Sequence, residues 1–497
     1  MTAAAGCGII YFLWGVVCIM DTSGNRAWKV ETNGVNVVPD GEKTARPRDL
    51  FWLWFGANIG ILGILYGVII MGFHLGFLQA ILAAGIGSLS FLLVGVLSVA
   101  GRDGGLPMFV LSKTVFGFIG NRAPALVNWL NLLGWESVMA ITGALSLQAL
   151  FDILIGVKAT AGSLITGAVV FIFLVAVFSL FGYATLVFVQ KIAVWVFGGL
   201  TLWVILLLLR HTTWHGLMLA PSGSWLRGFL PAVSIIIAGT GISWSVAAAD
   251  YSRYVSRQSS TRSLILAVAL GGAIPLFVLM LTGILVASRM PDLASAANPI
   301  AVIGSALPGW MTIPYLIAVV GGLIAEANLS LYSSGLNLMA MGVRLPRQKT
   351  IWFDAVISLL TAGYILFFRP DFIASFEAFL TLIGIGLAAW AGVFFADWWW
   401  LRRHSGYDAE ILSQTRLHPQ TAQFNWLVLL SWGVGIGVGL LLTATSLYTG
   451  PLAKGVFAVS NLGVIVAFLL SGLLNSAALI LRRREVSRSG STYHSPS

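Results

Sequence analysis

Long apolar runs recur along the whole chain, and they restrict the fold more than any other feature of the sequence. Of the 497 residues, 58% are hydrophobic and 9% are charged, whereas a typical soluble protein has about 25% charged residues. So few charges could not cover the surface of a soluble protein of this size. Because helices satisfy their own backbone polar groups within a bilayer, the sequence predicts an all-α integral membrane protein.

Twelve segments are long and apolar enough to cross a bilayer as helices of about 20 residues. When segment 21–48 is placed in the cytoplasm and the spans alternate from there, most of the 28 lysines and arginines fall on the cytoplasmic side, as is usual in membrane proteins. We therefore predict a multi-pass protein of the cytoplasmic membrane, with segment 21–48 and the C-terminus inside the cell. The predicted spans are 49–73, 76–100, 123–150, 163–182, 184–209, 229–249, 263–287, 310–341, 350–368, 373–397, 424–446 and 456–481.

The spans form one predicted membrane domain over residues 49–482, and the segments outside it differ in kind. The apolar residues 1–20 form an N-terminal extension of undecided status, because a thirteenth span and an upstream extension of the reading frame both account for it. Residues 483–497 are rich in serine, and we predict a disordered cytoplasmic tail.

Two of the spans contain glycines where a helix would be interrupted. The first includes FGANIGILGILYG, in which Asn58 lies among four glycines, and the sixth includes AGTGISW, with Gly239 and Gly241. Glycine-interrupted helices in matching positions are typical of a LeuT-like inverted repeat of five plus five helices, whereas close helix packing is the alternative explanation. We predict broken helices 1 and 6. The two repeats and the further helices would cover residues 49–209, 229–397 and 424–482.

Two carboxylates lie well inside predicted spans, Glu136 in the third and Glu326 in the eighth. Such residues are costly in a membrane and mark functional sites, including proton carriers; a structural hydrogen bond between helices is the alternative. Trp135 and Trp244 also lie within spans, away from the interfaces where tryptophan is common. Aromatic faces stack on flat heterocycles, although packing against lipid or core side chains is the ordinary explanation.

Several functional classes lack support. The two cysteines and six dispersed histidines form no metal-binding motif, and His211 and His215, which have ligand-like spacing, have no clear acidic partner. The sequence contains no HExxH motif, which would indicate a metalloprotease, and no P-loop, which would indicate ATP use. The net charge of +10 reflects basic cytoplasmic loops, so we predict no nucleic-acid partner. We predict no enzyme, metal or cofactor, apart from sodium as one of two candidate coupling ions.

Five motifs follow one another from about residue 33 to the last helix. They are NVVPDGEKTARPRDLFWLWFGANI (36–59), GGLPMFVLSKTVFGFIG (104–120), DYSRY (250–254), LYSSGL (331–336) with VRLPR after it, and ADWWWLRR (396–403). In order and spacing they resemble the purine-cytosine permease group of the nucleobase:cation symporter-1 family. The resemblance implies a twelve-helix LeuT-like fold and secondary active uptake of nucleobases or related rings, driven by sodium or protons.

The resemblance also implies roles for individual positions. Backbone carbonyls of the broken first helix would face a cation, and polar groups of the first and eighth helices would bind the ring edges. The ring would stack on Trp135 and on an aromatic of the sixth helix, which is Trp244 unless Gly241 occupies that register. With the two buried carboxylates included, the predicted substrate-binding residues are Asn58, Trp135, Glu136, Gly241, Ser243, Trp244 and Asn328, and the predicted cation-coupling residues are Ala57, Gly60, Ala325 and Glu326.

Two departures from the family pattern concern the ligands. Relatives often carry an amide four residues after the third-helix tryptophan, where this chain has Met139, while Glu136 follows Trp135 directly. Sodium-coupled relatives have hydroxyl side chains at the positions of Ala325 and Glu326. The loss of both hydroxyls weakens the case for sodium and favours proton coupling, or a site in which the carboxylate replaces the hydroxyls.

We predict a symporter that imports a purine or pyrimidine nucleobase such as cytosine by alternating access, coupled to a proton or sodium gradient. Glu326 is the first candidate for coupling, and Glu136 for ring recognition or proton transfer. The alternative in the same fold is a permease for another small heterocycle, such as hydantoin, allantoin or a vitamin-like ring. A channel is a third hypothesis, which saturable uptake would exclude.

Overall fold

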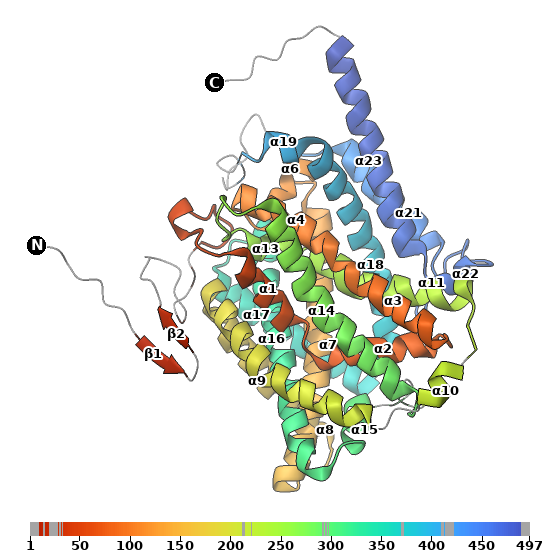
Figure 1. The fold of residues 1–497 in the computed structure, drawn as a ribbon. Coiled ribbons are helices and arrows are strands. Elements are labelled where there is room, and N and C mark those ends of the chain that lie inside the picture. Colours follow the sequence, from red (N-terminus) through yellow and green to blue (C-terminus); the bar gives the residue numbers. More distant parts are fainter. Residues whose placement is uncertain are drawn as a thin grey trace, which may run out of the picture.

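The computed structural model describes residues 9–12, 15–18, 28, 31, 33–210, 214–219, 221–290, 293, 296, 298–368, 372–408, 412 and 422–488. Over this part of the chain the protein is a bundle of tilted helices (Figure 1). Two short strands, β1 (Ile9–Phe12) and β2 (Gly15–Cys18), pair antiparallel with Ile9 opposite Cys18. They fall in the segment for which the sequence left a thirteenth span open.

Among the described residues, ten helical stretches are long and apolar enough to cross a membrane, and a bent pair of helices, taken as one span, makes eleven. They occupy the segments predicted as spans. The remaining predicted span, 424–446, contains an apolar helix of 16 residues, which is shorter than a full crossing of about 20 residues. The helical elements are η1 (Asp40–Glu42), α1 (Pro47–Ala57), α2 (Ile61–Gly72), α3 (Phe77–Leu89), α4 (Phe91–Gly104), α5 (Met108–Leu111), α6 (Lys113–Phe116), α7 (Arg122–Ile155), α8 (Ala161–Leu180), α9 (Tyr183–Leu209), α10 (Trp214–Leu219), η2 (Trp225–Phe229), α11 (Leu230–Ile237), η3 (Ala238–Ile242), α12 (Ser243–Ser245), α13 (Ala248–Ser252), α14 (Thr261–Ala287), α15 (Pro299–Ser305), α16 (Gly309–Met341), α17 (Arg347–Phe368), α18 (Phe372–Asp397), η5 (Trp398–Arg402), α19 (Arg403–Ser405), α21 (Trp426–Leu441), α22 (Phe457–Ser460) and α23 (Gly463–Arg488).

The first span is interrupted where the sequence predicts. The axes of α1 and α2 differ by 63°, and the chain between them passes through Asn58 and reaches an extended conformation at Gly60. Asn58 ends α1, because its Nδ2 donates a hydrogen bond of 2.8 Å to the carbonyl of Trp54. The N–H of Asn58 also donates to the carbonyl of Phe55 at 3.2 Å, so Asn58 satisfies two of the carbonyls that a helix C-terminus leaves open.

The sixth span differs from the prediction. Its backbone is not unwound at Gly239 and Gly241 but continues as the π-helical segment η3 into α12, and the helix is interrupted later, at residues 246–247. Both glycines instead allow close contacts: a Cβ on Gly239 would meet the Tyr66 hydroxyl, and one on Gly241 would meet Ser90. A wide helical turn accommodates these contacts without breaking the span.

Other glycines of the first span serve helix packing. A Cβ on Gly67 would meet the backbone of α14 at Met280 and Gly283, and a Cβ on Gly63 would be 2.7 Å from the side chain of Leu279. The alternative explanation of small residues at helix contacts therefore applies to these two positions. As a result, α2 lies directly against α14, while α16 packs along α7 and α9, and the interruption after α1 faces the space between these groups.

Candidate functional site

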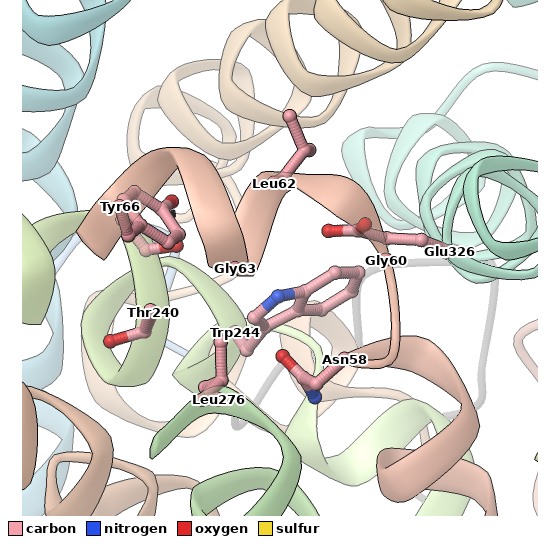
Figure 2. Close-up of a pocket in the computed structure, with 10 residues that line it drawn as sticks. Asn58, Gly60, Leu62, Gly63, Tyr66, Thr240, Trp244, Leu276 and Glu326 are labelled. Carbon is pink, nitrogen blue, oxygen red and sulfur yellow. Dashed lines mark hydrogen bonds between the residues drawn. The ribbon is translucent and has the colours of Figure 1, made fainter. Parts of the chain in front are cut away.

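A narrow cavity with a free volume of about 10 Å³ lies at the interruption between α1 and α2, which is room for about one water molecule. Figure 2 shows side chains from the broken span, η3, α12, α14 and α16 around it. Its wall carries a carboxyl, an amide, two kinds of hydroxyl and an indole, the groups that would contact a flat, polar ligand when the helices move apart. The residues that line it are Asn58, Gly60, Leu62, Gly63, Tyr66, Gly239, Thr240, Trp244, Leu276 and Glu326.

Glu326 is the acidic group of the cavity. It lies in the middle of α16, is 6% exposed, and points toward the chain between α1 and α2 (Figure 2). A Cβ added to Gly60 would be 3.3 Å from its Oε2. Within the described residues Glu326 has no hydrogen-bond or ion-pair partner. A buried carboxylate without a partner is costly, whereas the neutral acid is much less so, so this side chain is suited to gain and lose a proton or to hold a cation.

Trp244, Thr240 and Asn58 form the part of the wall suited to a ring. Trp244 is buried against Trp54, with ring centroids 5.4 Å apart and an edge-to-face geometry. Thr240 Oγ1 donates to the carbonyl of Ile236 at 2.6 Å. Asn58 uses its Nδ2 to end α1, and its Oδ1 lies on the side of Trp244 in Figure 2. The predicted residues Asn58, Gly60, Trp244 and Glu326 therefore come together in one place.

Trp135 and Ser243 do not line the cavity. The indole Nε1 of Trp135 donates to Ser243 Oγ at 2.7 Å, and Ser243 Oγ donates to Asn131 Oδ1 at 3.0 Å. The other side of the Trp135 ring packs edge-to-face on Phe376, with centroids 5.5 Å apart. These contacts tie α7 to α12 and hold both predicted residues behind the wall rather than on it.

Glu136 lies away from the cavity, between α7 and α17. Its Oε2 accepts a hydrogen bond of 2.8 Å from Ser358, and its Oε1 accepts one of 3.4 Å from Ser330. Near it, Asp354 accepts a hydrogen bond from Ser334 at 2.8 Å. This arrangement corresponds to the alternative given for Glu136, a structural hydrogen bond between helices, and it does not place the carboxylate near a ring in the cavity.

The remaining predicted residues also lie outside the cavity wall. Asn328 faces α8, where its Oδ1 accepts from Ser179 Oγ at 2.6 Å, and the N–H of Gly241 donates to Ser90 Oγ at 3.0 Å. The carbonyl of Ala325 accepts from Gln190 Nε2 at 2.6 Å, so it is already occupied. Ala57, in contrast, is the last residue of α1 and lies beside the interruption.

Tyr66 is a cavity residue that the sequence analysis did not select. Its hydroxyl donates to the carbonyl of Gly239 at 3.2 Å, and its ring stacks on Phe376 with centroids 6.0 Å apart. The only signal for it was its position in the glycine-rich first span. A second, mostly apolar cavity of about 240 Å³ lies between α7, α17 and α18 and is lined by Phe376. Phe376 thus lies between the two spaces.

A cavity at the interruption of a spanning helix, with an acid and an indole on its wall, is typical of a membrane transporter. The chain belongs to the family of permeases for cytosine/purines, uracil, thiamine and allantoin, whose model matches residues 37–467. This finding confirms the resemblance that the five motifs indicated.

Individual relatives agree with this assignment. The protein YxlA of Bacillus subtilis (strain 168), named as a purine-cytosine permease, is 23% identical over 86% of this chain and 91% of its own length. The purine-cytosine permease fcyB of Emericella nidulans is 24% identical over 86% of this chain and 84% of its own. The closed structure of Mhp1, a nucleobase-cation-symport-1 family transporter with bromovinylhydantoin bound, superposes with a TM-score of 0.69 at 19% identity and covers 94% of this chain and 96% of that one. The likeness confirms the predicted all-α, LeuT-like fold.

Proposed function

We propose that this protein imports a purine or pyrimidine nucleobase, such as cytosine, and that Glu326 carries the coupling proton. The observation on which the proposal depends is the position of Glu326, buried without a partner beside Gly60 in the same cavity as Trp244. The family and the names of the relatives support the class of substrate.

The wall of the cavity suits a flat ring with polar edges. The ring would stack on Trp244, a contact worth about 1–3 kcal/mol for a nucleic-acid base. Asn58 Oδ1 would accept a hydrogen bond from a ring N–H or amino group, and the Thr240 hydroxyl would bind another edge. Another heterocycle of similar size, such as hydantoin, allantoin or a vitamin-like ring, is the alternative substrate, since the same groups would bind it.

Proton coupling agrees better with the side chains than sodium coupling. Ala325 has no side-chain oxygen, and its carbonyl already accepts a hydrogen bond from Gln190, so Glu326 and the end of α1 are the ligands left for a cation. When Glu326 is protonated, the site is neutral and the helices can close over the ring at lower cost. The proton and the ring would then raise each other's affinity, as coupling requires. Sodium held by the carboxylate is the alternative.

Alternating access would involve the helices around the cavity. Tyr66 and Phe376 separate the cavity from the larger apolar space between α7, α17 and α18, and their separation would admit the ring from that side. We place this side outside the cell and the basic end, with Arg253 and Arg347, in the cytoplasm, in agreement with the bias of basic residues toward cytoplasmic loops.

The coupling ion can be tested in proteoliposomes with an imposed proton or sodium gradient. We expect a proton gradient to drive cytosine accumulation by the wild type, and Glu326→Gln to lose this accumulation while retaining cytosine binding. Glu377→Gln, in α18 and outside the cavity, is the matched control and should accumulate cytosine normally. Accumulation that requires sodium and ignores the proton gradient would overturn the assignment of Glu326 as a proton carrier.

The substrate can be identified by thermal unfolding of the purified protein with cytosine, other nucleobases, hydantoin, allantoin and thiamine. A ligand that binds the folded state raises the unfolding temperature by mass action. The largest shift with a nucleobase would support the proposal. A shift with hydantoin, allantoin or thiamine alone would favour the alternative substrate class.

A further inference from the structure

A surface groove separate from the cavity lies where α1 and α14 begin. The two helices pack against each other (Figure 1), and an open groove of about 560 Å³ lies between their first turns. The residues that line it are Pro47, Arg48, Phe51, Ser260, Arg262, Ser263, Leu266, Ala267 and Leu270.

The polar end of the groove is positively charged. Arg48 and Arg262 are both exposed, and neither forms an ion pair with an acidic residue in the described part of the chain. The nearest acidic residue in sequence, Asp49, is engaged by Lys191 at 2.9 Å. Two guanidinium groups that have no protein partner, one on each wall of a groove, match a phosphate group, which arginine binds through paired N–H donors.

The other end of the groove is apolar. Phe51 lies one turn beyond Arg48, and Leu266 and Leu270 follow Arg262 at successive turns of α14, with 43% and 44% of their surfaces exposed. Ile274 and Val278 continue this exposed row along the helix. Charge at one end and an apolar row that runs along a spanning helix together match a ligand with an anionic head and hydrocarbon tails. A free anion or a soluble peptide would leave the apolar row uncovered.

We propose that this groove binds an anionic phospholipid, with its phosphate between Arg48 and Arg262 and an acyl chain along Leu266 and Leu270. The lipid belongs to the inner leaflet in the orientation proposed above, but its binding does not depend on the identity of the transported ring. Because Arg48 lies in α1, which leads into the interruption at the cavity, the lipid also holds α1 against α14. It therefore stabilises the closed arrangement of these helices.

Lipid titrations of the purified full chain test the proposal. The protein in detergent micelles is titrated with phosphatidylglycerol or phosphatidylcholine at low salt, and thermal unfolding is followed. We expect phosphatidylglycerol to stabilise the wild type more than phosphatidylcholine. In the double variant Arg48→Gln, Arg262→Gln the apparent affinity for phosphatidylglycerol should fall about fivefold for each arginine, since a basic residue near an anionic lipid surface contributes about 1 kcal/mol.

Two variants and one further probe serve as controls. Arg344→Gln removes an exposed arginine that does not line the groove and should leave the preference for phosphatidylglycerol unchanged, and Arg48→Lys, Arg262→Lys should retain most of it. An equal preference in the double glutamine variant and the wild type would overturn the proposal. Equal stabilisation of the wild type by inorganic phosphate would also overturn it, because the ligand would then be a free anion. If the double glutamine variant fails to fold, the single variants Arg48→Gln and Arg262→Gln give this comparison, each with about a fivefold loss of apparent affinity.

Discussion

The Glu31 carboxylate and the Arg253 guanidinium form an ion pair with 2.8 Å between Oε1 and Nη2, and both side chains are almost fully buried. The Tyr254 hydroxyl donates to the same carboxylate at 2.6 Å, the Tyr332 hydroxyl donates at 3.0 Å, and the N–H of Tyr183 donates at 3.1 Å. One carboxylate from the N-terminal segment thus joins α9, α16 and the end of α13. This segment covers the basic end of the bundle.

Aromatic contacts connect this cluster with the cavity. Tyr251, two residues before Arg253, packs edge-to-face on Trp54 with centroids 5.3 Å apart, and Trp54 packs in the same way on Trp244. Opening of the cavity toward the basic end would therefore require the Glu31 contacts to separate. Neither Glu31 nor Arg253 was selected from the sequence as a functional residue, although DYSRY was noted as a motif.

The first prediction concerns release of the N-terminal segment. Glu31→Gln should release the N-terminal segment, because it leaves the buried charge of Arg253 without its partner. Removing one partner of a buried ion pair costs about 3–5 kcal/mol of stability. We expect trypsin to cleave after Lys43 at least tenfold faster, as measured by mass spectrometry. Asp152→Asn is the control, since its pair with Lys158 is exposed and lies away from the N-terminal segment, and exposed pairs contribute little. Equal cleavage of Glu31→Gln and the wild type would show that the ion pair does not hold the segment.

The same contact predicts a dependence on pH. Burial by itself would raise the pKa of Glu31, but Arg253, Arg347 and the Tyr254 hydroxyl outweigh it and hold this pKa below its usual value of 4.5. A carboxyl whose pKa is lowered by its contacts stabilises the bound N-terminal segment at pH values above the usual pKa of the free group. This stabilisation is lost as the pH falls through the lowered pKa. Hydrogen exchange of residues 33–46 should therefore be constant from pH 7 to about 5 after correction for intrinsic rates.

Below that range the protection of residues 33–46 should decrease in the wild type. In Glu31→Gln no carboxyl titrates at this position, so protection should be low throughout and should not change with this titration. A wild-type protection that decreases between pH 7 and 5 would contradict the lowered pKa of Glu31 and point to another group.

The third prediction separates the two tryptophans. Trp244 lines the cavity, so Trp244→Ala should raise the dissociation constant of the transported ring about fivefold to 100-fold, the equivalent of one lost stacking contact. Trp135→Phe removes only the hydrogen bond to Ser243 and should change this constant less than about threefold, within the usual contribution of a neutral hydrogen bond. Isothermal titration with the ligand found by thermal unfolding provides the measurement. A larger effect of Trp135→Phe than of Trp244→Ala would place the ring at Trp135 instead.

The fourth prediction concerns the contact between the interrupted span and the coupling group. A Cβ at Gly60 would be 3.3 Å from Glu326 Oε2, so Gly60→Ala displaces the carboxyl. The carboxyl must then shift by a few tenths of an ångström from the interruption, and we expect proton-driven accumulation to fall at least fivefold. Gly72→Ala adds the same methyl group in α2 with no atom within 4 Å and should transport normally. Equal transport by both variants would argue that Glu326 tolerates displacement and is not the coupling group.

The spans and the interruption after α1 could be predicted because they depend on local properties of the chain. A run of about 20 apolar residues matches the thickness of the bilayer whatever its neighbours are, and Asn58 among glycines ends a helix through its own backbone contacts. The glycines of the sixth span did not have the same effect. Gly239 and Gly241 are used for contacts with Tyr66 and Ser90, which only the packing of other helices brings to them.

The sequence by itself determined that this chain is a helical membrane protein with a break in its first span and a carboxyl in its eighth. The tertiary structure decided which polar groups share a cavity: Glu326 and Trp244 face it, whereas Glu136 bonds to Ser358 and Trp135 to Ser243. The physical reason is that lipid and protein interior are both apolar. Hydrophobic periodicity therefore does not show which face of a spanning helix is turned inward, and the rotation of each helix is set by its packing against its neighbours.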